Sequence, residues 1–260
     1  MDIKAILKKE VLEGLRNYRF LILFIGILFF AIFDPLMNKL VLPEVLKSQF
    51  PNMPEEIMRE MLITTQVASI RGYMNSVYQI STLIIAFTLS GIIAQEISGK
   101  TLILPVCAGK RYEEMLVAKG SVYGGFLLLA TTISALINYG YAGVLFGFDL
   151  PSILPALRAG VLQGFYMLYV VFLLIFIGAL TRKPITAGML TLLAAYGTRV
   201  LGGIFNLHRY LPSGLLVEAE LLAVAPSFTL WGSLISTLTI VIVLYGLTII
   251  RLTNLELTRG

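Results

Sequence analysis

The residues of this sequence that come nearest to a known chemical motif are Gly99, Lys100 and Thr101. With Ala94 ahead of them, they match the spacing of the phosphate-binding loop that ends in Gly-Lys-Thr. Such a loop needs several backbone N–H groups aimed at one anion, supplied by a glycine-rich turn between a strand and a helix. Here the turn has a single glycine and follows the end of an apolar run. The sequence therefore predicts that this chain binds no nucleotide itself.

Polar residues inside long apolar runs suggest a second kind of chemistry, because they could line a path for a transported molecule. In membranes such side chains usually face protein or water rather than lipid. Hydrogen bonds between helices are an equally good explanation of them. The candidates lie on two runs, at helical spacing in the first: Asn75, Tyr78, Gln79 and Thr82 on one, and Thr191, Tyr196 and Arg199 on the other.

Metal and disulfide chemistry are not expected. His208 and Cys107 are each the single residue of their type, so neither has a second ligand of its kind for a metal, and no disulfide framework exists. No titratable residue lies at the middle of the predicted spans two to six, which disfavours a proton-coupled carrier.

Composition places the chain in lipid. Of its 260 residues, 57% are hydrophobic and 13% are charged, whereas a soluble domain is about 25% charged. One core cannot bury so many apolar side chains, so the solvent for most of them is a bilayer. The net charge of +5 is explained by membrane topology, and we expect no nucleic-acid partner.

The apolar runs predict an all-α integral membrane protein with a single transmembrane domain over 1–260. A span needs about 20 apolar residues and must be helical, because lipid cannot pair backbone groups. Six such runs are present, and we expect spans at 20–42, 74–94, 121–148, 154–180, 185–205 and 230–250.

Lysines and arginines near the span ends set the orientation. With the N-terminus inside, the inner segments contain more basic residues than the outer ones. The sequence therefore predicts a multi-pass protein of the cell membrane with both termini in the cytoplasm.

Four segments outside the spans carry further expectations. Residues 1–19 are basic and amphipathic, which favours a helix lying in the membrane interface. The outer loop 43–73 is expected to contain a short helix that starts near Pro54. A re-entrant pair of short helices is expected between spans five and six. Residues 95–119 form a charged cytoplasmic segment with a helix suited to a groove on a partner protein.

The segment between spans two and three carries a family resemblance. The chain resembles the permease subunit of the ABC type-2 exporter family, whose coupling segment has a Glu, then Gly-Thr-Leu, a short apolar stretch, a Pro and a basic residue. Lys100 departs from this pattern because it is inserted between the Gly and the Thr. The matching residues are Glu96, Gly99, Thr101, Leu102, Pro105 and, for the basic position, Lys110 or Arg111.

The resemblance implies a function and partners. Two permease chains, here a homodimer, form the cargo path, and separate ATPase subunits hold ATP and magnesium and perform the hydrolysis. This chain would then be no enzyme and have no cofactor of its own. Two other functions stay open: a channel or secondary carrier that works alone, and a membrane assembly factor without cargo.

Overall fold

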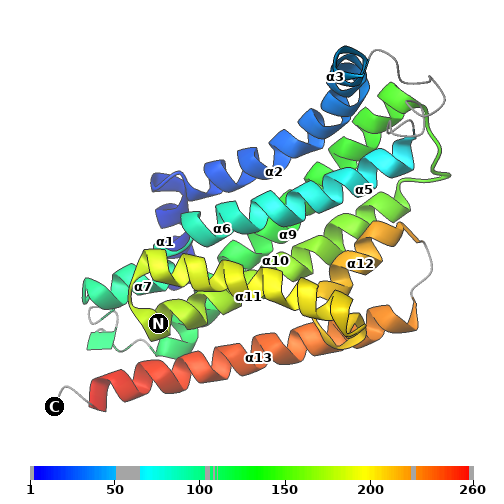
Figure 1. The fold of residues 1–260 in the computed structure, drawn as a ribbon. Helices are drawn as coiled ribbons and strands as arrows, with labels where there is room; N and C mark the ends of the chain where they lie inside the picture. The colour runs from blue at the N-terminus through cyan, green and yellow to red at the C-terminus, as the bar shows by residue number, and fades with distance from the viewer. Residues whose placement is uncertain are drawn as a thin grey trace.

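The computed structural model of the chain describes residues 3–50, 65–102, 106–107, 109, 111–223 and 227–257. Every regular element within these ranges is a helix, and they contain no strand. Six helical stretches among them are long and apolar enough to cross a membrane, which confirms the prediction of an all-α chain with six such helices (Figure 1). In chain order the elements are α1 (Ile3–Arg16), α2 (Arg19–Leu36), η1 (Met37–Val41), α3 (Leu42–Gln49), α5 (Gln66–Ser76), η2 (Val77–Ser81), α6 (Thr82–Thr88), α7 (Gly91–Ser98), α9 (Tyr112–Phe146), α10 (Leu154–Thr181), α11 (Pro184–Ile204), η3 (His208–Tyr210), α12 (Ser213–Leu221) and α13 (Phe228–Leu257).

The helical stretches extend beyond the predicted spans at three places. The first runs over Arg19–Gln49, the second over Gln66–Ser98, and the third starts at Tyr112. The added turns are rich in polar residues, so hydropathy does not detect them. The remaining three stretches differ from the predicted spans by only a few residues.

The segment 43–73, predicted as an outer loop, is helical at both of its ends. α3 continues from η1 up to Gln49, and α5 already begins at Gln66. The side chain of Thr65 accepts a hydrogen bond from the backbone N–H of Ala68 and so caps α5. The short helix predicted from Pro54 lies outside the described residues.

α10 is the centre of the bundle. It packs against α9, α11, α12 and α13, and 67% of its most apolar stretch is buried. Glycines allow the close approach of α9: a Cβ at Gly160 would lie 2.8 Å from the Cα of Thr132, and one at Gly164 would lie 2.7 Å from the Cα of Leu128. This Gly-x-x-x-Gly pair is therefore used for packing within the chain.

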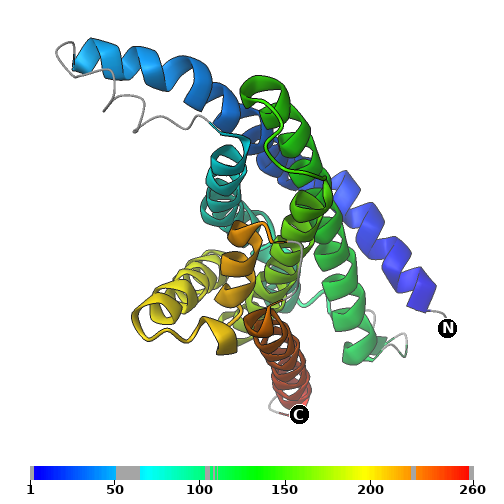
Figure 2. The same ribbon diagram turned by 90° about the vertical axis from the view of Figure 1, so that its right-hand side faces the viewer.

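Short helices lie at the two ends of the bundle. α1 and α3 run across the direction of the long helices, α1 at the end where α7 and both termini lie and α3 at the opposite end (Figures 1 and 2). α12 lies at the same end as α3 and packs on α10, α13 and α5. The bundle thus has one end built from α1, α7 and the start of α9, and another built from α3, α5 and α12.

Candidate functional site

Five of the seven predicted path residues surround one cavity. It has a volume of about 520 Å³ and lies between α5 with η2 on one side and α11 on the other. We call it the tyrosine cavity. Its lining residues are Asn75, Tyr78, Gln79, Tyr196, Arg199 and Val200.

A π-helical segment shapes one wall of the tyrosine cavity. Tyr78 and Gln79 both belong to η2, the π-helical turn that interrupts the helix between α5 and α6. Such π-turns occur frequently at functional sites. The hydroxyl of Tyr196 donates a hydrogen bond to the backbone carbonyl of Gln79, so a side chain of α11 is tied to this turn across the cavity.

Arg199 is the charged residue of the cavity wall. Its guanidinium carbon lies 4.5 Å from the centre of the Tyr78 ring, a distance typical of a cation–π contact. Its Nη2 donates a hydrogen bond of 2.6 Å to a carboxylate oxygen of Glu220 on α12. The Tyr78 ring in turn meets the Tyr196 and Tyr166 rings edge-on, with centroids 5.6 and 5.7 Å away. Aromatic and cationic surface thus forms one continuous wall.

The two predicted threonines do not line the cavity. Thr82 and Thr191 are both fully buried. Each donates to a carbonyl of its own helix, Thr82 to Tyr78 and Thr191 to Ala187. The prediction placed Thr82 on the face of Asn75 by α-helical spacing. The π-turn adds a residue between them and rotates the next part of the helix by roughly 100°, which turns Thr82 into the bundle.

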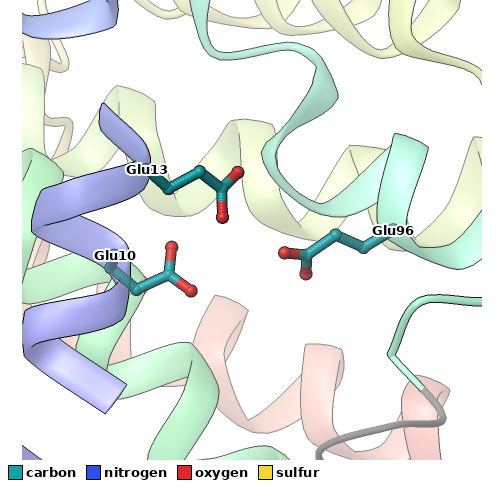
Figure 3. A group of neighbouring side chains, drawn as sticks. All are labelled: Glu10, Glu13 and Glu96. Carbon is teal, nitrogen blue, oxygen red and sulfur yellow. The ribbon is translucent and has the colours of Figure 1, made fainter. Parts of the chain in front are cut away.

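A cluster of charges lies at the opposite end of the bundle. Figure 3 shows the carboxylates of Glu10 and Glu13, from α1, turned toward that of Glu96, from α7. One oxygen from each lies within 4.8 Å of the others, a spacing that a metal ion could bridge. Three cations, however, already contact these carboxylates. We call the whole group the charge cluster: Lys9, Glu10, Glu13, Arg19, Glu96 and Lys119.

Lys119 holds the charge cluster together. Its ammonium group lies 2.9 Å from both carboxylate oxygens of Glu10 and 2.8 Å from an oxygen of Glu96. The side chains of Lys119 and Glu10 are 0% and 2% exposed. Lys9 contacts all three carboxylates at 3.0 to 3.3 Å, and Arg19 contacts Glu13 at 3.1 Å. Three acids and three bases balance, so the carboxylates need no metal ion for neutrality.

Lys9 and Glu13 of the charge cluster have pKa values that are shifted by their charged neighbours. Burial lowers the pKa of the Lys9 ammonium group, but the negative charges of Glu96, Glu10 and Glu13 outweigh it and raise the pKa well above its usual range. Burial raises the pKa of the Glu13 carboxyl, but the positive charges of Lys119, Lys9 and Arg19 outweigh it and lower the pKa. Both groups are therefore held in their charged forms.

The turn with Gly99, Lys100 and Thr101 is the C-terminal cap of α7. Lys100 adopts the left-handed conformation, with φ of 57°, while Gly99 stays helical with φ of −81°. The helix thus ends at Ser98 with Gly99 as its C-cap residue, and the left-handed residue that follows is Lys100. The Thr101 N–H donates to the Glu96 carbonyl at 3.0 Å and the Lys100 N–H to that of Ile97 at 3.2 Å, the pattern of a Schellman motif.

This cap uses the backbone N–H groups that a bound phosphate would need. The N–H groups of Gly99 and Leu102 also donate to carbonyls of α7, at 2.8 and 3.4 Å. The amides that a phosphate-binding loop would aim at an anion therefore point back at the helix. A hydrogen bond of 3.3 Å from the Thr101 hydroxyl to the Glu96 carbonyl adds to the cap.

The residues predicted to contact an ATPase are not equally accessible. Gly99, Thr101 and Arg111 are exposed, while Leu102 is buried. Glu96 points into the charge cluster, with 14% of its side chain exposed. Pro105 and Lys110 lie outside the described residues. The helix predicted after them is described and forms the start of α9, from Tyr112. Thr101 and Arg111 are thus the side chains of this set that are free to meet a partner.

Sequence reasoning missed the partners of both sites. Glu10 repeats after Ile6 on the buried face of α1, and this i, i+4 spacing was the one available signal for it. Lys119 lies 109 residues from its partner Glu10, so no local pattern connects the two. Glu220 reaches Arg199 from a different helix, so helical spacing does not connect these two residues either.

Comparison of the chain with protein-family models, with curated proteins and with solved structures finds no match. Its function is therefore argued from the tyrosine cavity and the charge cluster themselves.

Proposed function

We propose that this chain is the membrane-spanning subunit of an ATP-driven exporter of the ABC type-2 class. Two copies would form the cargo path, and separate ATPase subunits would bind the end of the bundle that carries α1, α7 and the start of α9. The protein would lie in the cell membrane with both termini in the cytoplasm, as the distribution of lysine and arginine favours.

The tyrosine cavity is the observation that carries this proposal. Asn75 and Gln79, at its edge, are exposed although they belong to a stretch long and apolar enough to cross a membrane. Lipid would leave most of their amide hydrogen-bonding groups unpaired, which is costly. A second copy and a water-filled path between the copies would satisfy them. A polar cavity on the flank of a bundle is thus better explained as half of a path than as a surface facing lipid.

The charge cluster supports a coupling role for the other end. It connects α1, α7 and α9 through buried ion pairs, so a push on the turn after α7 would move these helices together. In this arrangement α1 lies in the membrane interface, and its exposed Val11 and Leu15 face the lipid. α12 is the re-entrant element at the opposite end.

The test is reconstitution with an ATPase. The full chain is placed in proteoliposomes with the ATPase encoded beside it, and ATP hydrolysis is measured with and without the chain. We expect the chain to stimulate hydrolysis and Arg111→Glu to abolish that stimulation, because Arg111 is exposed next to the predicted contact. Lys183→Glu is the matched control, a cation in the neighbouring turn between α10 and α11.

Three outcomes would overturn the proposal. Loss of stimulation by both variants would indicate a nonspecific charge effect. Failure of the chain to bind or stimulate any ATPase would favour an assembly factor. Transport by the chain in ATPase-free vesicles would favour a channel or secondary carrier. Glu96 is unsuitable for this test, because its reversal would disrupt the charge cluster and destabilise the fold.

A further inference from the structure

The charged side chain on the wall of the tyrosine cavity is a cation. Among its lining residues, Arg199 alone is charged. Its counter-ion Glu220 reaches it from α12 and does not belong to the lining. The remaining wall consists of two tyrosine rings and two amide side chains, with Val200 beside them. A ligand of this cavity therefore meets a cation, aromatic faces and neutral hydrogen-bonding groups.

Arg199 keeps unused binding capacity. A guanidinium group has five N–H donors, and Nη2 is bound to Glu220. Nη1 is shielded from water and has no hydrogen-bond partner among the described residues. A donor left in this way costs free energy until an acceptor reaches it. Carboxylates, sulfonates and phosphates offer two oxygens in the geometry that a guanidinium fork binds best.

The Glu220 carboxylate is a counter-ion that a ligand can displace. The side chains of Arg199 and Glu220 are 25% and 29% exposed, and ion pairs with this exposure are weak because water screens them. A ligand anion that displaced Glu220 would take over the Nη2 donor, and a rotation of the guanidinium toward the cavity would bring the shielded Nη1 to the same anion. The cavity volume of about 520 Å³ lies within the range of small-molecule sites.

We propose that the tyrosine cavity binds an organic anion that carries an aromatic ring. The anionic group pairs with Arg199 in competition with Glu220, and the ring packs against Tyr78 and Tyr196. Asn75 and Gln79 hydrogen-bond to polar substituents at the edge. This assignment names the cargo class of the proposed exporter and rests on that proposed function.

Binding to the full chain tests the assignment without an ATPase. The chain is reconstituted in lipid nanodiscs, and the probe is 2-naphthalenesulfonate, with the neutral 2-naphthalenesulfonamide as its matched analogue. Equilibrium dialysis against empty nanodiscs corrects for partition into lipid. We expect the sulfonate to bind at least tenfold more tightly than the sulfonamide, since a charged hydrogen bond is lost with the neutral probe, on the order of a tenfold effect.

Three variants locate the site. Arg199→Gln should lower the affinity for the sulfonate by roughly tenfold or more and leave the sulfonamide unchanged. Glu220→Gln should raise the affinity for the sulfonate by roughly two- to fivefold, because it removes the competing carboxylate. Arg209→Gln is the matched control: Arg209 also lies over an aromatic ring, 4.1 Å from that of Phe228, but it does not line the cavity.

Arg199→Gln and Glu220→Gln together also separate folding from binding. If Arg199→Gln fails to fold, the gain in Glu220→Gln remains an independent test. Equal binding of the two probes, no gain in Glu220→Gln, or an equal loss in Arg209→Gln would each overturn the assignment. Because no ATPase takes part, a negative result here leaves the exporter proposal standing, and an ATPase that never pairs with the chain leaves this binding result standing.

Discussion

The charge cluster and the tyrosine cavity use similar chemistry to different ends. In both, a basic side chain on one helix meets at least one glutamate from another helix. Lys119 is fully buried and makes three contacts of 2.8 to 2.9 Å. Arg199 is partly exposed, makes one contact with a carboxylate and keeps an unpaired Nη1. Lys119 thus uses its three N–H donors, whereas Arg199 does not use all of its own. In the charge cluster, the buried oxygen that lacks a hydrogen-bond partner among the described residues belongs to Glu96.

This difference in pairing indicates a structural role for Lys119 and a binding role for Arg199. A buried ion pair with all its partners in place fixes how helices lie, because breaking it exposes an uncompensated charge to a low dielectric. A partly exposed pair beside a cavity holds its partners weakly and can exchange them. Charged residues inside a membrane protein therefore have to be judged by what remains unpaired and not by their presence alone.

The largest effect is expected from Lys119→Met in the charge cluster. It keeps the apolar stem but leaves Glu10 buried without its closest cation. The expected loss of stability is about 3–5 kcal/mol, the usual effect of removing one partner of a buried pair. Thermal or denaturant unfolding of the chain in detergent would measure it.

Lys8→Met is the matched control for this change. Lys8 lies on the same helix as Glu10, is exposed, and should alter stability by less than about 0.5 kcal/mol. A loss in Lys119→Met of about 1 kcal/mol or less, far below the usual effect, would show that the cluster does not hold the helices together. The contrast with the cavity would then disappear.

A smaller effect is expected from the same kind of change in the cavity. Arg199→Met removes a partly exposed ion pair and a cation–π contact, and also removes an unpaired buried donor. The net loss of stability should be about 1 kcal/mol or less, several-fold below that of Lys119→Met under the same conditions. Equal losses in the two variants would assign Arg199 a structural role, and the cavity would no longer differ from the cluster.

Much of this architecture can be predicted from the sequence, because a bilayer requires long apolar helices. The polar start of the second stretch cannot. Gln66 is fully buried, and its side chain bonds the backbone of Tyr139, Asp149 and Leu150. Those partners are 73 to 84 residues away, so no local pattern indicates that a polar turn is helical and packed.

The tyrosine cavity and the charge cluster could also be predicted only in part from the sequence. Helical spacing grouped Asn75, Tyr78 and Gln79, which do line one cavity. It failed at Thr82, which follows the π-turn η2 and therefore has a different register. Hydropathy does not predict such a turn. The charge cluster escaped prediction for another reason: its acids and bases come from segments that meet only in the folded chain.

The smallest effect concerns the pH dependence of the charge cluster. Burial raises the pKa of Glu13, but Lys119, Lys9 and Arg19 lower it, so that the net pKa in the folded protein lies below the ordinary 4.5. A carboxyl whose pKa is lowered by folding stabilises the fold in full at pH values above its pKa in the unfolded protein. This contribution is lost as the pH falls through its pKa in the folded protein. Glu13→Gln removes the contribution at every pH.

The stability difference between the unchanged chain and Glu13→Gln should therefore be constant near neutral pH and shrink below pH 4.5. Unfolding temperatures in detergent at about pH 7 and at about pH 3.5 would measure it. In a Lys9→Met background one of the three cations is missing, so the difference at neutral pH should be smaller. A stability difference that does not change with pH in either background would mean that Glu13 contributes through packing. The charge cluster would then consist only of Lys119 and the carboxylates of Glu10 and Glu96.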